Sequence, residues 1–122
     1  MKAYLFVALG GSLGALFRYA VSGWIQQLAG GLFPWGTLFV NVLGSFLLGL
    51  LYEVAMRAVV PPEWRLFWAV GVLGAFTTFS TFSYETLGML REGAWVPGLA
   101  YALGSPALGV GAALVGVWLG GR

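Results

Sequence analysis

The sequence contains no cysteine and no histidine. Without cysteine, disulfides, thiolate metal sites and covalent haem attachment are excluded. Without histidine, the chain lacks the one side chain that titrates near neutral pH without help from its surroundings. We therefore exclude redox and metal-hydrolase chemistry and do not expect an enzyme.

Charge is also scarce. Only 8% of the residues are charged, against about 25% in an ordinary soluble domain, while 60% are hydrophobic and the mean hydropathy is +0.90. So few polar groups cannot coat a water-soluble globule, which indicates an integral membrane protein. The six basic and four acidic residues are scattered, so no nucleic-acid partner is expected.

Long uncharged runs cover residues 3–17, 19–52, 66–84 and 93–121, and a helix that spans a bilayer needs about 20 mainly apolar residues. We therefore predict an all-α membrane protein with four transmembrane helices, at about residues 3–28, 34–58, 64–90 and 96–120. Residues 1–122 would form a single integral domain that crosses the cell (inner) membrane several times.

Basic residues fall unequally on the two sides of this arrangement. The termini and the middle loop carry Lys2, Arg57, Arg65 and Arg122, whereas the last loop carries Arg91. The positive-inside rule therefore favours both termini in the cytoplasm, by a small margin.

Glycine supplies 20 of the 122 residues, and small residues recur at intervals of four. Such spacing lets helix backbones approach closely in lipid, and it predicts compact helix packing at Gly10 and Gly14, at Gly116 and Gly120, and along Ser105, Gly109 and Ala113.

The third apolar stretch holds nine consecutive residues, 77–85, without an aliphatic side chain. A continuous helix would place polar or aromatic residues on two of its sides: Phe79, Phe82 and Ser83 on one, and Thr77, Thr81 and Tyr84 on the other. Gly71 and Gly74 lie just before this segment and are followed by two β-branched threonines, Thr77 and Thr78. We predict that the helix breaks here. Carbonyls freed by a break inside the membrane need an ion, water or another helix as partner.

Two further polar residues lie within apolar helices. Arg18 is a functional candidate because an ionisable residue inside a spanning segment costs roughly 2.5 to 3.5 kcal/mol, although it could also reach the interface by snorkelling. Asn41 either serves the site or makes an interhelical hydrogen bond. Phe79 and Phe82 either face an ion or pack as ordinary aromatic residues.

The polar groups inside the predicted helices are mostly hydrogen-bond donors. Away from the helix ends they comprise hydroxyls, one carboxamide and an arginine, with no acidic residue near the middle of the first, second or fourth helix. Phenyl rings add positive ring edges. A cation or proton transporter would need a central carboxylate, so this inventory favours an assembly that binds or conducts anions.

Three stretches of the sequence, at residues 10–19, 36–46 and 74–83, resemble the CrcB or Fluc family of fluoride channels. The similarity extends over the whole chain, and the motif at residues 74–83 is the most specific. The resemblance implies an antiparallel, dual-topology homodimer in which the third helix is broken. It also implies two narrow fluoride pores and a structural sodium ion at the dimer interface.

Site residues are carried over on the same resemblance. Phe79 and Phe82 match the pore phenylalanines, and Asn41 matches the pore asparagine. Gly74 and Thr77 match the residues whose carbonyls bind sodium, and Arg18 would supply positive charge near a vestibule. The remaining matches are polar residues along the pore: Ser80, Thr81, Ser83, Glu85, Tyr101 and Ser105.

The resulting hypothesis is a passive, fluoride-selective channel that exports cytoplasmic fluoride and confers resistance to it. Its partners would be fluoride, membrane lipid and a second copy of the chain. A small four-helix, dual-topology exporter of cations or drugs is the alternative, and it would need a glutamate in the first helix. A non-transporting assembly subunit is a third possibility, which predicts no flux from the purified protein.

Overall fold

Four helical stretches are long and apolar enough to cross a membrane in the computed structural model, which describes residues 1–122. They cover Lys2–Ala29, Trp35–Arg57, Pro62–Arg91 and Trp95–Gly120, and no end differs from the expected ranges by more than two residues. The elements are α1 (Lys2–Ala29), α2 (Trp35–Arg57), α3 (Pro62–Arg65), the π-helical η1 (Leu66–Leu73), α4 (Gly74–Phe76), α5 (Phe79–Arg91) and α6 (Trp95–Gly120).

The outer surface of the chain is apolar. Only 17 of the 122 residues are buried, and large hydrophobic side chains on every long helix are exposed, among them Leu16, Phe39, Val70 and Leu103. A surface of this kind is stable against lipid and unstable against water. The fold therefore agrees with the composition in placing the chain in a membrane.

The loop between α1 and α2 is fixed without charged residues. Gly30 and Gly31 adopt positive φ angles of 69° and 76°, a conformation that glycine reaches without steric penalty. The Gln26 side chain then donates to the carbonyl of Phe33 at 3.0 Å and accepts from the amide of Gly36 at 3.1 Å. One carboxamide thus joins the end of α1 to the beginning of α2.

Glycine contacts bring the helices together in two pairs, as the spacing predicted. In the first pair, α1 packs on η1 at Gly10 and Gly14. A Cβ atom on either glycine would collide with a backbone carbonyl oxygen of the neighbouring segment. In the second pair, α2 packs on α6 with equally close approaches at Gly49 and Gly116.

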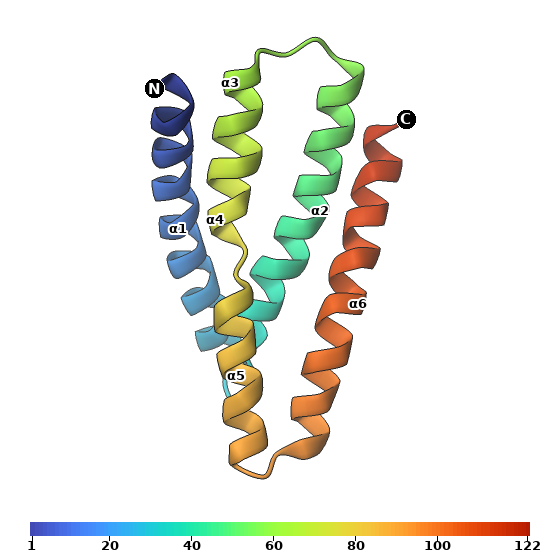
Figure 1. Cartoon of the computed structure of the whole chain (residues 1–122). Coiled ribbons are helices and arrows are strands. Elements are labelled where there is room, and N and C mark those ends of the chain that lie inside the picture. Colours follow the sequence, from blue (N-terminus) through green and yellow to red (C-terminus); the bar gives the residue numbers. More distant parts are fainter.

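Figure 1 shows both chain termini at the same end of the molecule as the loop between α2 and α3. The α1 and η1 segments lie together on one side of the bundle, and α2 lies beside α6 on the other. The first half of the third span packs mainly against α1, whereas its second half, α5, packs against α6.

The third span is broken, as expected, and the break lies at the two threonines that follow the predicted glycines, not at the glycines themselves. Gly74 is helical, with φ −62° and ψ −35°, and Gly71 lies within η1 against Gly10. The extended residues are Thr77 (φ −88°, ψ 159°) and Thr78 (φ −150°, ψ 125°). Gly71 allows close helix packing, whereas the break itself falls on two β-branched residues, of which Thr78 is held by the side chain of Asn41.

This position also corrects the expected helix faces. Thr77 lies in the break and is not part of α5, so it does not share a helical face with Thr81 and Tyr84. The π-helical turn pattern of η1, over Leu66–Leu73, was not predicted. It places a wider helix one short α-helical turn, α4, before the break, and π-helical segments often occur near functional sites.

Candidate functional site

Asn41 holds the break from α2. Its Nδ2 atom donates to the Thr78 carbonyl at 3.0 Å, and its Oδ1 atom accepts from the Thr78 amide at 2.7 Å. The side chain therefore pairs with one residue of extended backbone as a neighbouring β-strand would. Because an unpaired backbone group in the membrane costs several kcal/mol, this pairing stabilises the extended conformation of Thr78.

Arg18 holds the other side of the break from α1. Its Nε atom donates to the Ala75 carbonyl at 3.1 Å, a carbonyl that a continuous helix would pair with the amide of Phe79. The side chain is half-buried and is directed toward the third span. In the structure, Arg18 therefore binds a carbonyl next to the break.

Thr78 begins α5 as its N-cap. Its hydroxyl accepts from the Thr81 amide at 3.3 Å and lies 3.2 Å from the Thr81 hydroxyl. A threonine cap of this kind satisfies one of the free amides at a helix start. The same residue therefore ends the interruption and starts the next helix.

A second polar cluster lies further along α5, around Glu85. The Thr37 hydroxyl of α2 donates to Oε2 of Glu85 at 2.9 Å, and the Tyr101 hydroxyl of α6 donates to Oε1 at 2.9 Å. Thr37 and Tyr101 are buried, with exposed fractions of 4% and 1%. One carboxylate thus joins three helices, and both hydroxyls are directed at it.

Aromatic rings connect the two polar regions. The centroids of Phe79 and Phe82 lie 5.9 Å apart, and the Phe82 ring packs at a tilt of 57° on Tyr101, the donor to Glu85, with centroids 4.9 Å apart. Phe79 is 79% exposed, so little of its surface packs within the chain. Its ring is available to a neighbouring molecule or ion.

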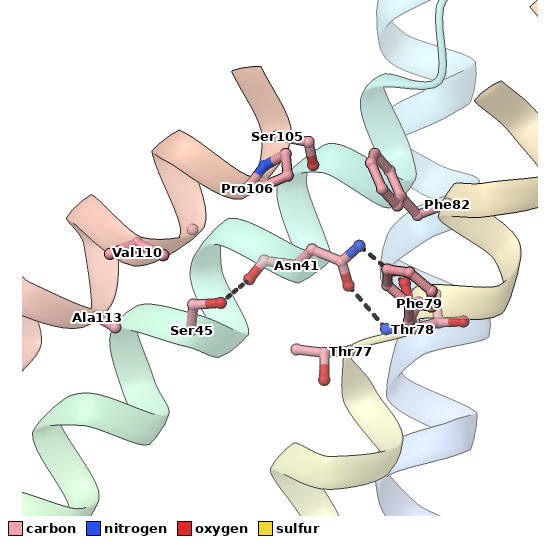
Figure 2. A pocket seen from close by; sticks show the side chains of 11 residues that line it. Asn41, Ser45, Thr77, Thr78, Phe79, Phe82, Ser105, Pro106, Val110 and Ala113 are labelled. Atoms are coloured by element: carbon pink, nitrogen blue, oxygen red, sulfur yellow. Dashed lines mark hydrogen bonds between the residues drawn. The ribbon is translucent and has the colours of Figure 1, made fainter. Parts of the chain in front are cut away.

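An open hollow of about 400 Å³ lies beside the break, between α2, α5 and α6. Figure 2 shows Asn41 near its middle, with Phe79 and Phe82 on the α5 side and Ser105 and Pro106 on the α6 side. No charged side chain lines it. The full lining is Asn41, Ser45, Thr77, Thr78, Phe79, Phe82, Ser105, Pro106, Gly109, Val110 and Ala113.

The structure divides the predicted site residues into groups. Asn41, Thr77, Phe79, Phe82 and Ser105 share the hollow. Glu85 and Tyr101 form the second cluster. Ser80, Ser83 and Gly74 are exposed on the surface of the third span, Thr81 bonds the helix cap, and Arg18 contacts the break from α1.

Sequence reasoning missed Thr37, Ser45 and Thr78 as members of these clusters. Thr37, Asn41 and Ser45 are spaced by four, and so form one polar stripe along an otherwise apolar α2. The Ser45 hydroxyl donates to the Asn41 carbonyl at 2.7 Å. That spacing was the available signal for Thr37 and Ser45, whereas nothing in the local sequence distinguishes Thr78 from Thr77.

Backbone carbonyls are the ligands that the site offers to a cation. No group of three or more carboxylate, imidazole or thiolate side chains is close enough to bind a metal ion. The Thr78 amide, which a continuous helix would direct to the Gly74 carbonyl, donates to Asn41. No loop or side-chain hydrogen bond reaches the carbonyls of Gly74 or Thr77.

Comparison with known proteins identifies the family. The pattern of the family described as "CrcB-like protein, Camphor Resistance (CrcB)" matches residues 5–117. The chain belongs to the CrcB family. A relative from Thermus thermophilus, named fluoride-specific ion channel FluC, is 53% identical over 121 residues, which cover 99% of this chain and 95% of the relative.

Relatives from other organisms carry the same name. The relative from Leptospira interrogans serovar Lai is 44% identical over 119 residues, covering 97% of this chain and 94% of its own length. The relative from Shewanella woodyi is 54% identical over 96 residues, covering 79% of this chain and 77% of its own length. The CrcB members that match this chain are named as ion channels and not as enzymes.

Proposed function

We propose that the protein is a passive, fluoride-selective channel of the cell membrane, which exports cytoplasmic fluoride and confers resistance to it. The observation that carries this proposal is the uncharged hollow beside the helix break, where an amide, hydroxyls and two phenyl rings meet. Relatives that align over nearly the whole chain are named fluoride-specific channels. Hydrogen fluoride enters cells as a neutral acid and ionises, and the negative interior then drives the anion outward.

Fluoride is small and strongly hydrated, so a pore must replace its water shell with close donors. The Asn41 amide retains one N–H beyond its bond to Thr78, and the edges of Phe79 and Phe82 carry partial positive charge. These groups bind an anion without a fixed positive charge that would trap it, in keeping with the need for binding weak enough to permit release. Once a second chain packs against the exposed ring of Phe79, the gap between the rings would be too narrow for a wider anion such as chloride.

The path continues from the rings along polar residues toward Glu85. Tyr101 packs on Phe82 and donates to Glu85, so its position is fixed relative to both. The carboxylate keeps the Thr37 and Tyr101 hydroxyls in place, while Ser80, Thr81, Ser83 and Ser105 supply further hydroxyls. Arg18 adds positive charge on the opposite side of the break.

We propose that two chains assemble as an antiparallel homodimer. The hollow is open on one side, and Phe79, Ser80 and Ser83 lie exposed next to it. Exposed hydroxyls are poorly solvated by lipid, so a second chain is needed as the missing wall. An inverted mate would supply a second Phe79 and close two equivalent pores.

A structural sodium ion at the dimer interface fits the residues present. Carbonyls of unwound membrane helices are ligands that transport proteins offer to Na⁺, and no loop or side-chain hydrogen bond reaches the Gly74 and Thr77 carbonyls at this break. One chain supplies two oxygens and a two-fold mate would supply two more. When bound, the ion would neutralise the partial negative charge of these carbonyls and hold the two breaks together.

Flux from liposomes that contain only this protein tests the function. Under a potassium diffusion potential, the protein should release fluoride and retain chloride. Comparable chloride release, or release that needs a proton gradient in place of voltage, would overturn the proposal. The alternative of a four-helix exporter requires an acidic residue in the first helix, and α1 has none.

A further inference from the structure

A second recess lies far from the helix break, where the beginning of α1 meets the beginning of the third span. Its volume is about 630 Å³, within the range of roughly 300–1,000 Å³ that is typical of small-molecule sites. It shares no lining residue with the hollow beside the break. The lining is Lys2, Leu5, Phe6, Pro61, Glu63, Trp64, Phe67 and Trp68.

The recess carries one positive and one negative side chain that are not paired with each other. The chain has a single ion pair, between Arg57 and Glu53 at 3.4 Å. Lys2 and Glu63 therefore face the same recess without neutralising each other. The recess thus presents a cation and an anion that are not in contact with each other, an arrangement that is complementary to a zwitterion.

The rest of the recess is a continuous apolar wall. Leu5 and Phe6 contribute from α1, and Phe67 and Trp68 contribute from η1. The Phe67 and Trp68 rings meet edge to face, with centroids 4.9 Å apart. A wall of this kind suits a hydrocarbon chain.

The position of the recess along the molecule matches a membrane interface. Lys2 begins the first span and Pro62 begins the third, and Figure 1 shows both at the same end of the bundle. Trp64 and Trp68 lie there, as tryptophans commonly do at the level of lipid head groups. The charged part of the recess is thus at head-group depth, and its apolar part extends toward the hydrocarbon.

We propose that this recess binds a membrane phospholipid whose head group carries a phosphate and a primary ammonium. Lys2 would pair with the phosphate, Glu63 with the ammonium, and an acyl chain would lie along Phe6, Phe67 and Trp68. A primary ammonium donates hydrogen bonds to Glu63, which a trimethylammonium group cannot do. A glycerol head group would leave Glu63 without a partner and next to the phosphate.

Native mass spectrometry of the purified, delipidated protein tests the site. Phosphatidylethanolamine, phosphatidylcholine and phosphatidylglycerol with identical acyl chains are added in turn, and bound lipids are counted per chain. We expect phosphatidylethanolamine to be retained about threefold better than the other two, the scale of one partly exposed ion pair. Glu63→Gln should remove the preference over phosphatidylcholine, and Lys2→Gln should weaken retention of all three lipids.

Arg65→Gln is the matched control, because Arg65 is a charged neighbour that does not line the recess, and it should bind lipid as the wild type does. Equal retention of all lipids, a preference for phosphatidylglycerol, or unchanged preference in both Lys2→Gln and Glu63→Gln would overturn the proposal. So would a change in oligomeric mass in those two variants, since it would mean that a second chain occupies the recess. Fluoride flux is measured separately, so failure here leaves the proposed channel function untouched.

Discussion

The Nε atom of Arg18 donates to the Ala75 carbonyl at 3.1 Å, and thereby joins the first membrane span to the interrupted backbone of the third. This contact separates two effects of the residue, its hydrogen bond and its charge. Glutamine has an amide nitrogen the same number of bonds from Cα as Nε of arginine, so it keeps the donor without the charge. Methionine has a similar length and keeps neither.

We expect Arg18→Met to lower the free energy of unfolding by about 1–3 kcal/mol, because the Ala75 carbonyl loses its partner. Arg18→Gln should be closer to the wild type in stability. Thermal unfolding in detergent measures both. Equal stability of the two variants would show that the hydrogen bond does not support the break. If Arg18→Gln keeps the stability of the wild type, its fluoride flux reports the effect of the lost charge alone.

Asn41→Ala should destabilise the break from the α2 side. It removes the partners of both the Thr78 amide and the Thr78 carbonyl, and an unsatisfied buried group costs about 1–3 kcal/mol. Fluoride efflux from liposomes should fall strongly. Ser45→Ala is the control in the same hollow, because the Ser45 hydroxyl bonds only its own helix, and it should retain most of the flux.

Phe79→Ile and Phe82→Ile should both reduce fluoride flux heavily while the fold is retained. The ring of Phe79 is largely exposed, so its replacement should change stability by no more than about 0.5 kcal/mol. Phe82 packs on Tyr101 and should be the more destabilising of the two. Liposome efflux and thermal unfolding, measured together, distinguish a pore role from packing, since unchanged flux in both variants would leave packing as their function.

Gly14→Ala should separate α1 from η1. Its Cβ atom would collide with the Val72 carbonyl oxygen, whereas a Cβ atom on Gly11 would meet nothing within 4 Å. We expect Gly14→Ala to lower stability by about 1–3 kcal/mol and Gly11→Ala to leave it unchanged or slightly raised. A melting temperature that is equally affected in the two variants would contradict close packing at Gly14.

The four spans were predictable because each depends on a local property, the length of an uncharged apolar run. The break was predictable as an event but not in position. Gly71 is a residue type that often interrupts helices, but here it allows α1 and η1 to pack closely at Gly10. The break lies instead at Thr78, which is held by the side chain of Asn41, 37 residues earlier in the sequence. Such long-range pairing leaves no local trace.

The candidate site follows the same division. Phe79 and Phe82 stand out within their own segment, and Asn41 stands out in an apolar helix. The cluster around Glu85 depends on partners 48 and 16 residues away. The only sequence signal for it was the spacing of four residues between Thr37 and Asn41. The π-helical form of η1 has no signal in its apolar sequence.

The open side of the hollow at Phe79 affects when a newly made chain can begin to conduct fluoride. Under the proposed assembly, a newly inserted chain has no closed pathway of its own and stays silent until it meets a chain of the opposite orientation. Fluoride tolerance after the start of synthesis would then lag behind the amount of protein in the membrane. The lag would shorten as synthesis is raised, because encounters between chains depend on their density.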